Sequence, residues 1–148
     1  MDAFHKLSLF LPGGKAMPIN FKYDNDTNTL YLKVTGILKS SEIIDYFNKL
    51  LNGNFLKKGF VEVVDLNETT DFVLCYSDLS IIEELTKKLN NIGQKATLMC
   101  GYNNVSKGIS SMMMPLYCRA DFEFVICNSE YDLKRYMTAL EKTSRQYN

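Results

Sequence analysis

Several residue types that usually carry chemistry are scarce or missing in this 148-residue sequence. It contains a single histidine, His5, and no tryptophan. Since His5 lies in the first few residues, a Ser–His or Cys–His nucleophile in the body of the chain has no base. The glycine-rich patterns GxGxxG and GxxxxGK[ST], which hold phosphates, are also absent. These absences exclude the familiar triad hydrolases and dinucleotide or P-loop enzymes.

Charge of one sign and long apolar runs are missing too. Seventeen basic and seventeen acidic residues cancel, whereas a nucleic-acid binder carries a basic excess. The same balance argues against a strongly anionic membrane partner. No apolar run approaches the roughly 20 residues that span a bilayer. We therefore expect no nucleic-acid partner and no membrane span.

The four cysteines show no CxxC spacing and no neighbouring histidine, which argues against a zinc site. Without a secretory signal, their spacing favours reduced thiols and a cytoplasmic protein. Arg119 follows Cys118 and could make that thiol reactive by lowering its pKa. Packed, inert thiols are the favoured interpretation for all four. They are Cys75, Cys100, Cys118 and Cys127.

The first sixteen residues, MDAFHKLSLFLPGGKA, stand apart from the rest. Their apolar core is too short for a signal peptide, and Pro12-Gly13-Gly14 interrupts it. We expect a poorly ordered extension at 1–16, from an alternative start or an expression remnant, rather than a docking arm. A domain at 17–142 and a polar tail at 143–148 that frays complete the expected organisation.

The first half of the predicted domain opens with a hairpin. Residues 19–23 and 30–34 alternate apolar and polar side chains around the turn at 24–28, DNDTN. Gly36 is expected to end the second strand. Ser40 or Ser41 then caps a helix that stops at Gly53.

Strand and helix patterns alternate through the remaining chain, and the predicted order is β-β-α-β-α-β-α-β-α. Because strand–helix–strand crossovers place successive strands parallel, this order predicts an α/β fold with a mixed sheet and an antiparallel N-terminal hairpin. The later predicted elements are strands at 60–64, 96–100 and 122–127, a helix from Ser77 or Ser80 to Gly93, a short helix at 109–116 disturbed by Pro115, and a last helix capped by Ser129.

Polar loops at 65–71, 101–108 and 128–129 are expected to meet at the carboxyl ends of the parallel strands, where such sheets bind ligands. Asp65 and Asp71 could form a carboxylate pair for acid–base work, with Lys107 holding an anion. The same residue types are standard in turns and caps. The structural interpretation is favoured, and we expect no catalytic residue, cofactor or metal.

The run Met112-Met113-Met114, followed closely by Tyr117, offers flexible apolar contact. Methionine adapts to varied apolar partners, so this segment could floor a groove for a lipid-like ligand or a partner helix. Its alternative interpretation is core packing under a short helix.

The phrases VVDLNETTDF and SDLSIIEEL resemble the STAS-like fold of the anti-sigma-factor antagonists, with Asp65-Leu66 matching their Asp-Leu pair and Asp71 their loop-ending aspartate. The segments KGISSMMMPLY and FEFVIC look like the stand-alone SpoIIAA-like bacterial branch. In signalling members a phosphorylated serine follows the aspartate. Here Phe72 follows Asp71, so that phosphoacceptor does not carry over, although other hydroxyls lie nearby. The resemblance implies a non-enzymatic binding or regulatory module.

Three hypotheses follow from these patterns. The first is a regulatory module that binds a protein partner through the loop 65–77 and the following helix. The alternatives are a carrier of a small apolar or lipid-like ligand and, less favoured, a small enzyme using Asp65 and Asp71. A homodimer would cover the edge of the hairpin. The predicted binding residues are Asp65, Asn67, Thr69, Thr70, Asp71, Ser77, Asn103, Ser106, Lys107, Met112, Met113 and Tyr117.

Overall fold

The computed structural model describes residues 18–117 and 121–146, with side chains described as far as residue 142. The predicted order of strands and helices is confirmed. The extension predicted at 1–16 and the pair Cys118-Arg119 lie outside the described residues. The elements are β1 (Ile19–Asp24), β2 (Thr29–Lys39), α2 (Ser40–Gly53), β3 (Val61–Val73), the 3-10 turn η1 (Tyr76–Asp78), α3 (Leu79–Ile92), β4 (Ala96–Cys100), α4 (Asn104–Tyr117), β5 (Glu123–Cys127) and α5 (Glu130–Gln146).

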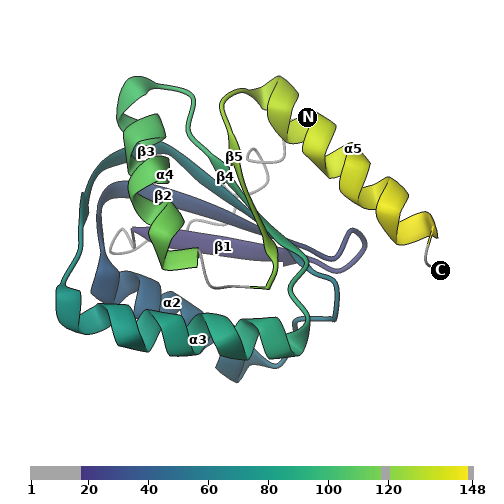
Figure 1. Cartoon of the computed structure of the whole chain (residues 1–148), viewed down its shortest axis with the longest axis horizontal. Coiled ribbons are helices and arrows are strands. Elements are labelled where there is room, and N and C mark those ends of the chain that lie inside the picture. Colours follow the sequence, from purple (N-terminus) through teal and green to yellow (C-terminus); the bar gives the residue numbers. More distant parts are fainter. Residues whose placement is uncertain (1–17, 118–120, 147–148) are drawn as a thin grey trace.

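The strands form one mixed sheet in the order β1-β2-β3-β4-β5 (Figure 1). β1 and β2 pair antiparallel, and every later pair is parallel, which confirms the predicted α/β class. The hairpin turn closes with Asn28 in the left-handed region, at φ 50°. The Tyr23 hydroxyl donates to the Asn28 side-chain oxygen and holds this turn.

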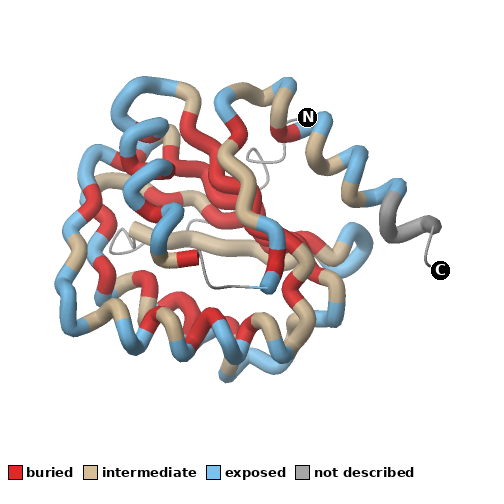
Figure 2. The backbone as a smooth tube through the Cα atoms, viewed as in Figure 1, coloured by how far each residue is buried: buried red, intermediate tan, exposed pale blue. Residues whose placement is uncertain are grey.

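The buried residues gather along the strands of the sheet (Figure 2), and because side chains alternate along a strand, they form one cluster on each face. Leu32, Val64 and Met99 belong to the larger cluster, which α2, α3 and α4 cover. Val63, Leu98 and Cys127 belong to the smaller cluster, which α5 covers. On α5 the predicted apolar side supplies Leu133, with Tyr136, Met137 and Leu140 partly buried around it.

The predicted loop at 65–71 is wrong, because β3 continues as a strand from Val61 to Val73. Asp65 is opposite Cys100, the last residue of β4, whereas β3 stays paired with β2 until Val73 is opposite Lys39. The two strands therefore run on as a two-stranded ribbon, 34–39 with 66–73, which we call the β2–β3 ribbon.

Gly36 lies inside β2, so the prediction that it ends the strand is also wrong. It sits at φ 74°, next to one of two register shifts that bend the ribbon. Leu66, Thr69 and Phe72 are buried along the ribbon. The Thr69 hydroxyl donates to the Val34 carbonyl at 3.0 Å. This segment is a strand although its sequence is polar, because it pairs with β2 and because these three side chains are buried.

Two predicted helix caps are wrong as well. Ser40 and Ser80 lie within the first turns of α2 and α3, and neither helix has a side-chain cap. The buried Ser40 hydroxyl instead donates to Asp78 Oδ2 at 2.7 Å and accepts from the Cys75 N–H at 2.9 Å. Ser40 therefore fastens the turn after the β2–β3 ribbon to the start of α2. Ser77 is exposed and lies 3.1 Å, Oγ to Sγ, from Cys75.

The last two helices differ from prediction in length. α4 is a continuous helix of 14 residues that includes Pro115, rather than a short disturbed one. Ser129 caps α5 as predicted, since its hydroxyl accepts from the Asp132 N–H at 3.1 Å. α5 continues to Gln146, into the segment predicted as a tail.

Candidate functional site

Asn67 lies on β3 just beyond the point where its pairing with β4 ends, and it joins β3 to the loop that follows β4. Its side-chain N–H and backbone N–H both donate to Asp65 Oδ1, at 2.8 and 2.9 Å. Its side-chain oxygen accepts from the Tyr102 N–H at 2.7 Å, and its carbonyl accepts from the Asn103 side chain at 3.1 Å. The structure thus brings together the predicted residues Asp65, Asn67 and Asn103.

Asp65 is buried at this junction and has an altered electrostatic environment. Burial raises the pKa of its carboxyl group, while the two hydrogen bonds from Asn67 and the charge of Lys33 act in the opposite direction. Lys33 also forms an ion pair with Glu68, at 3.3 Å between Nζ and Oε1. A carboxylate that is enclosed and already bonded to its neighbour orients Asn67 rather than facing a substrate.

Asn103 and Ser106 form a reciprocal cap at the start of α4. The Ser106 N–H donates to Asn103 Oδ1 at 2.9 Å, and the Asn103 N–H donates to Ser106 Oγ at 3.2 Å. Gly101 passes directly beneath this turn. A Cβ added at Gly101 would lie 2.6 Å from the Ser106 carbonyl carbon and oxygen. The predicted residues Asn103 and Ser106 are thus occupied in fixing α4 to the end of β4.

Replacing Asn67 by alanine is expected to lower the free energy of unfolding by about 1 kcal/mol, because the Tyr102 N–H and Asp65 lose their partner. Urea denaturation followed by circular dichroism measures the change. Thr70→Ala is the matched control, since Thr70 is exposed on the same strand, and its effect should stay within about 0.5 kcal/mol. Equal stabilities for both variants would contradict a structural role for Asn67.

The remaining predicted polar residues are not drawn together. Asp65 and Asp71 stand six positions apart on β3, so at about 3.3 Å per residue they lie nearly 20 Å apart. The predicted carboxylate pair is therefore wrong. Asp71 accepts from the Phe72 N–H at 2.8 Å. Lys107 is exposed on α4.

Of the hydroxyls near the resemblance motif, Thr70 and Ser77 are exposed. Thr69 is 3% exposed and bonded to Val34, so a kinase could not reach it in the folded protein. The residues of the segment 112–117 are likewise partly buried and partly exposed. Met113 and Tyr117 are buried in the larger core cluster, whereas Met112 is exposed on α4. Met112 and its neighbour Met114, which is also exposed, are the methionines of this segment that can offer apolar contact at the surface.

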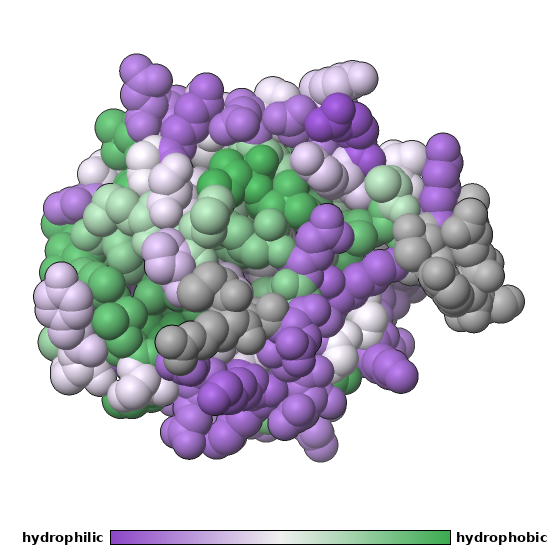
Figure 3. Space-filling model, viewed as in Figure 1, coloured by the Kyte–Doolittle hydropathy of each residue, from purple (hydrophilic) through white to green (hydrophobic). Residues whose placement is uncertain are grey.

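An exposed apolar surface gathers at the end of the β2–β3 ribbon and the start of α3, and none of its four residues is among the predicted binding residues. Leu38 and Phe72 point into the core, so Ile37 and Val73, on the opposite side of the same strands, face outward. Figure 3 shows hydrophobic surface over this part of the molecule, at the left of the view. We call Ile37, Val73, Tyr76 and Ile81 the ribbon-end surface; their exposed fractions are 51%, 48%, 83% and 44%.

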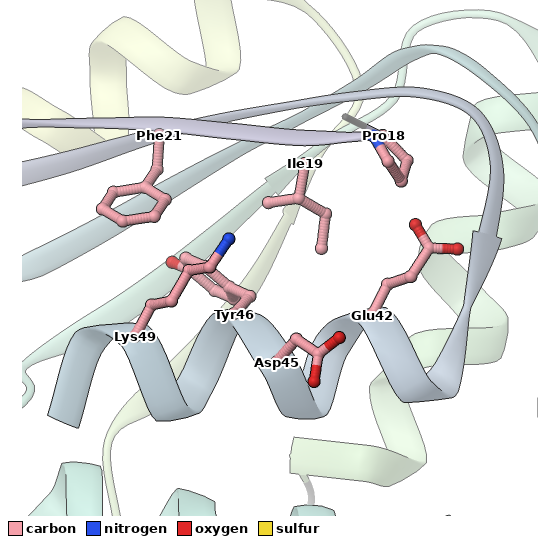
Figure 4. A pocket seen from close by; sticks show the side chains of 7 residues that line it. All are labelled: Pro18, Ile19, Phe21, Glu42, Asp45, Tyr46 and Lys49. Atoms are coloured by element: carbon pink, nitrogen blue, oxygen red, sulfur yellow. The ribbon is translucent and has the colours of Figure 1, made fainter. Parts of the chain in front are cut away.

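A groove also opens between β1 and α2 (Figure 4). Ile19 and Phe21 reach into it from β1, while Glu42, Asp45 and Lys49 rise from α2. It encloses about 50 Å³, whereas sites for drug-sized ligands occupy roughly 300–1,000 Å³. This groove is too small to be the cavity of a lipid carrier.

The described segments contain neither a cluster of metal-binding side chains nor a helix that could span a membrane. No three of their His, Cys, Asp and Glu side chains cluster as a metal site would require. No helix among residues 18–117 and 121–146 combines the length and apolar character needed to cross a bilayer.

The sheet order and the helices on both faces give the chain a SpoIIAA-like α/β fold, as the sequence resemblance implied. Among solved structures, the chain is similar to an uncharacterized DUF3478 family protein with a SpoIIAA-like fold from Shewanella loihica PV-4. The TM-score is 0.53 at 16% sequence identity, over 80% of this chain and 91% of that chain.

A second similar structure comes from the complex of the diguanylate cyclase SiaD with its activator SiaC from Pseudomonas aeruginosa. The TM-score is 0.46 at 12% identity, over 78% of this chain and 95% of that chain. No family model matches the sequence, and no curated protein matches it significantly.

Proposed function

We propose that this chain is a non-enzymatic regulatory module that binds a protein partner through the ribbon-end surface. The observation that carries the proposal is the exposure of four large apolar side chains, three of them within the segment 73–81 and the fourth on the strand paired with its beginning. Such clusters on a small domain mark interaction sites. The proposal keeps the predicted region, the segment 65–77 and the following helix, and adds Ile37 from the neighbouring strand.

The ribbon-end surface is preformed, which favours its use as a docking site. Ser40, in the first turn of α2, bonds to Cys75 and Asp78, which lie before and after Tyr76 in the chain. Leu66 and Phe72 anchor the ribbon in the core. A surface that is already ordered loses little conformational entropy when a partner binds.

The other two hypotheses have less support. The enzyme hypothesis loses its carboxylate pair, because Asp65 and Asp71 lie far apart on β3. The carrier hypothesis relied on Met112, Met113 and Tyr117 for apolar contact with a ligand. Met113 and Tyr117 are instead packed in the core. The protein-binding hypothesis retains Thr70, Asp71 and Ser77, which are exposed beside the ribbon-end surface.

Tyr76→Asp is expected to weaken partner binding at least tenfold, because a buried tyrosine anchor carries much of the energy of a protein interface. Tyr131→Asp is the matched control. Both tyrosines are highly exposed, 83% and 72%, but Tyr131 lies on α5, outside the ribbon-end surface. Wild type and both variants are used as bait in lysate of the host, the retained proteins are quantified by mass spectrometry, and affinity for the main one is measured by calorimetry.

The proposal is supported only if a protein is retained by wild type and Tyr131→Asp and lost with Tyr76→Asp. Equal retention by both variants would place the binding surface elsewhere. Native mass spectrometry of the purified chain supplies the second readout. A small apolar molecule carried through purification would favour the carrier instead.

A further inference from the structure

The last residues of β4 and β5 are both cysteines, and they face each other. Cys100 is the register partner of Cys127, and the Gly101 N–H donates to the Cys127 carbonyl at 3.3 Å just beyond them. Neighbouring strands lie about 4.8 Å apart, which falls within the Cα separation of disulfides, about 4.4–6.8 Å. Both side chains belong to the cluster beneath α5. A bridge therefore needs little backbone movement.

We infer that Cys100 and Cys127 are a redox-active thiol pair that closes to a disulfide across β4 and β5 when hydrogen peroxide is present. The inference does not depend on the proposed partner. The exposed Cys75 lies beside the Ser77 hydroxyl, so the part of the chain that the structure describes also contains an accessible thiol that is not paired with Cys100 or Cys127 across the strands.

The two thiols have different acidities, which assigns their roles. The Cys100 thiol donates to the Leu98 carbonyl at 3.8 Å, and the neighbouring Cys127 sulfur, together with burial, raises the pKa of Cys100. The neighbouring Cys100 thiol lowers the pKa of Cys127; burial and the Asp132 carboxylate act against this, and the Arg135 guanidinium acts with it. The Tyr102 hydroxyl lies beside the Cys100 sulfur, buried and without a hydrogen bond of ordinary geometry. Cys127 is thus the thiolate-forming nucleophile.

The reaction balances with peroxide as the two-electron oxidant. The Cys127 thiolate attacks one peroxide oxygen, the O–O bond breaks, and the products are a Cys127 sulfenic acid and hydroxide, which takes up a proton to become water. The Cys100 sulfur then attacks the sulfenic sulfur, the S–O bond breaks, and the S–S bond forms while the departing hydroxide takes the Cys100 proton and leaves as water. Two thiols are oxidised and one peroxide becomes two waters.

The position of the two cysteines also determines how peroxide reaches them and how easily their disulfide is reduced. Both cysteines are fully buried, but each ends its strand, and Asn128 directly after Cys127 is exposed. Peroxide must therefore reach the pair through opening of the first turn of α5. A bridge between adjacent strands departs from relaxed disulfide geometry, so a dithiol reduces it readily.

The test uses the full chain with Cys75→Ala and Cys118→Ala, which leaves two thiols. Dilute peroxide should remove two mass units from the folded protein, protect both thiols from alkylation and yield a cross-linked peptide pair containing Cys100 and Cys127. Dithiothreitol should restore the original mass. The unmodified sequence, digested after the same treatment, should give the same cross-link, which covers the case that the double variant folds poorly.

Cys127→Ala in that background should leave one alkylatable thiol and no cross-link. Two outcomes would overturn the inference. One is a folded protein in which both thiols remain alkylatable after denaturation. The other is a Cys100–Cys127 cross-link that forms only once urea has unfolded the chain.

Discussion

Replacing Gly101 by alanine should lower the free energy of unfolding by about 2–3 kcal/mol, the cost of forcing an extra methyl into a packed site. The added Cβ would meet the carbonyl carbon and oxygen of Ser106 at 2.6 Å and the Ser106 Cβ at 2.9 Å. Backbone atoms in a capped helical turn cannot swing aside as a flexible side chain can. Relief requires α4 to move away from β4, which stretches the bonds between Asn103 and Ser106. Urea denaturation measures the loss.

Gly108→Ala is the matched control for this prediction. Gly108 lies on the same helix, yet a Cβ added there has no neighbour within 4 Å. Alanine inside a helix is favoured over glycine by about 0.5–1 kcal/mol, so this variant should gain stability. A Gly101→Ala protein as stable as wild type would show that α4 does not press on the end of β4.

The elements that could be predicted from sequence are those whose pattern is local. Residues 19–34 carry a strand–turn–strand alternation, and 96–100 is a continuous apolar run. Gly93 follows a periodic helical segment, and it adopts the left-handed conformation expected of a helix end, at φ 106°. In each case the residues that determine the local structure lie within a few positions of one another, so the element can be predicted from a short stretch of sequence.

The β2–β3 ribbon could not be predicted in this way. Asp, Asn and Glu are depleted in strands, and 65–68 consists of three of them and Leu66. Their conformation is decided by β2, a strand some thirty positions earlier that stays paired with β3, across two register shifts, as far as Val73. The resemblance to anti-sigma-factor antagonists identified the fold class correctly but carried over a loop at this point.

The candidate site depends on the same long-range placement. Asn67 meets the backbone of Tyr102, 35 positions away, and Ser40 meets Asp78, 38 positions away. Val73, Tyr76 and Ile81 look like ordinary apolar residues in the sequence. They become a candidate docking surface because β4 ends at Cys100 while β3 continues, and no described helix covers the outer side of the ribbon.

Glu62 is a buried carboxylate in the middle of the larger core. It is 2% exposed and sits on β3 beneath α2. Tyr46 donates to its Oε2 at 2.5 Å, and Thr97 donates to its Oε1 at 2.9 Å. Gln94 donates in turn to the Thr97 hydroxyl at 2.7 Å. Two neutral donors and no cation among the described residues hold this group.

Burial raises the pKa of Glu62, and the bonds from Tyr46 and Thr97 offset only part of the rise. The folded state therefore binds the proton more tightly than the unfolded state does. The stability contributed by the protonated group is complete below the unfolded pKa, about 4.3, and is lost as the pH rises through the folded pKa. Asp65, whose pKa burial also raises, adds to the same slope.

Glu62→Gln is consequently expected to stabilise the protein at pH 8 by about 1–2 kcal/mol, because a buried ionised group becomes a neutral one that can still accept from Thr97. At pH 4 the two proteins should have nearly equal stability. Urea denaturation at half-unit pH steps measures both curves, and the slope that remains in the variant belongs to Asp65. Glu123→Gln is the control, since Glu123 is exposed at the start of β5 and should follow wild type. If Glu62→Gln instead kept the full wild-type slope, the carboxylate would have to be ionised in the core at every pH, and the hydrogen bonds from Tyr46 and Thr97 would outweigh its desolvation.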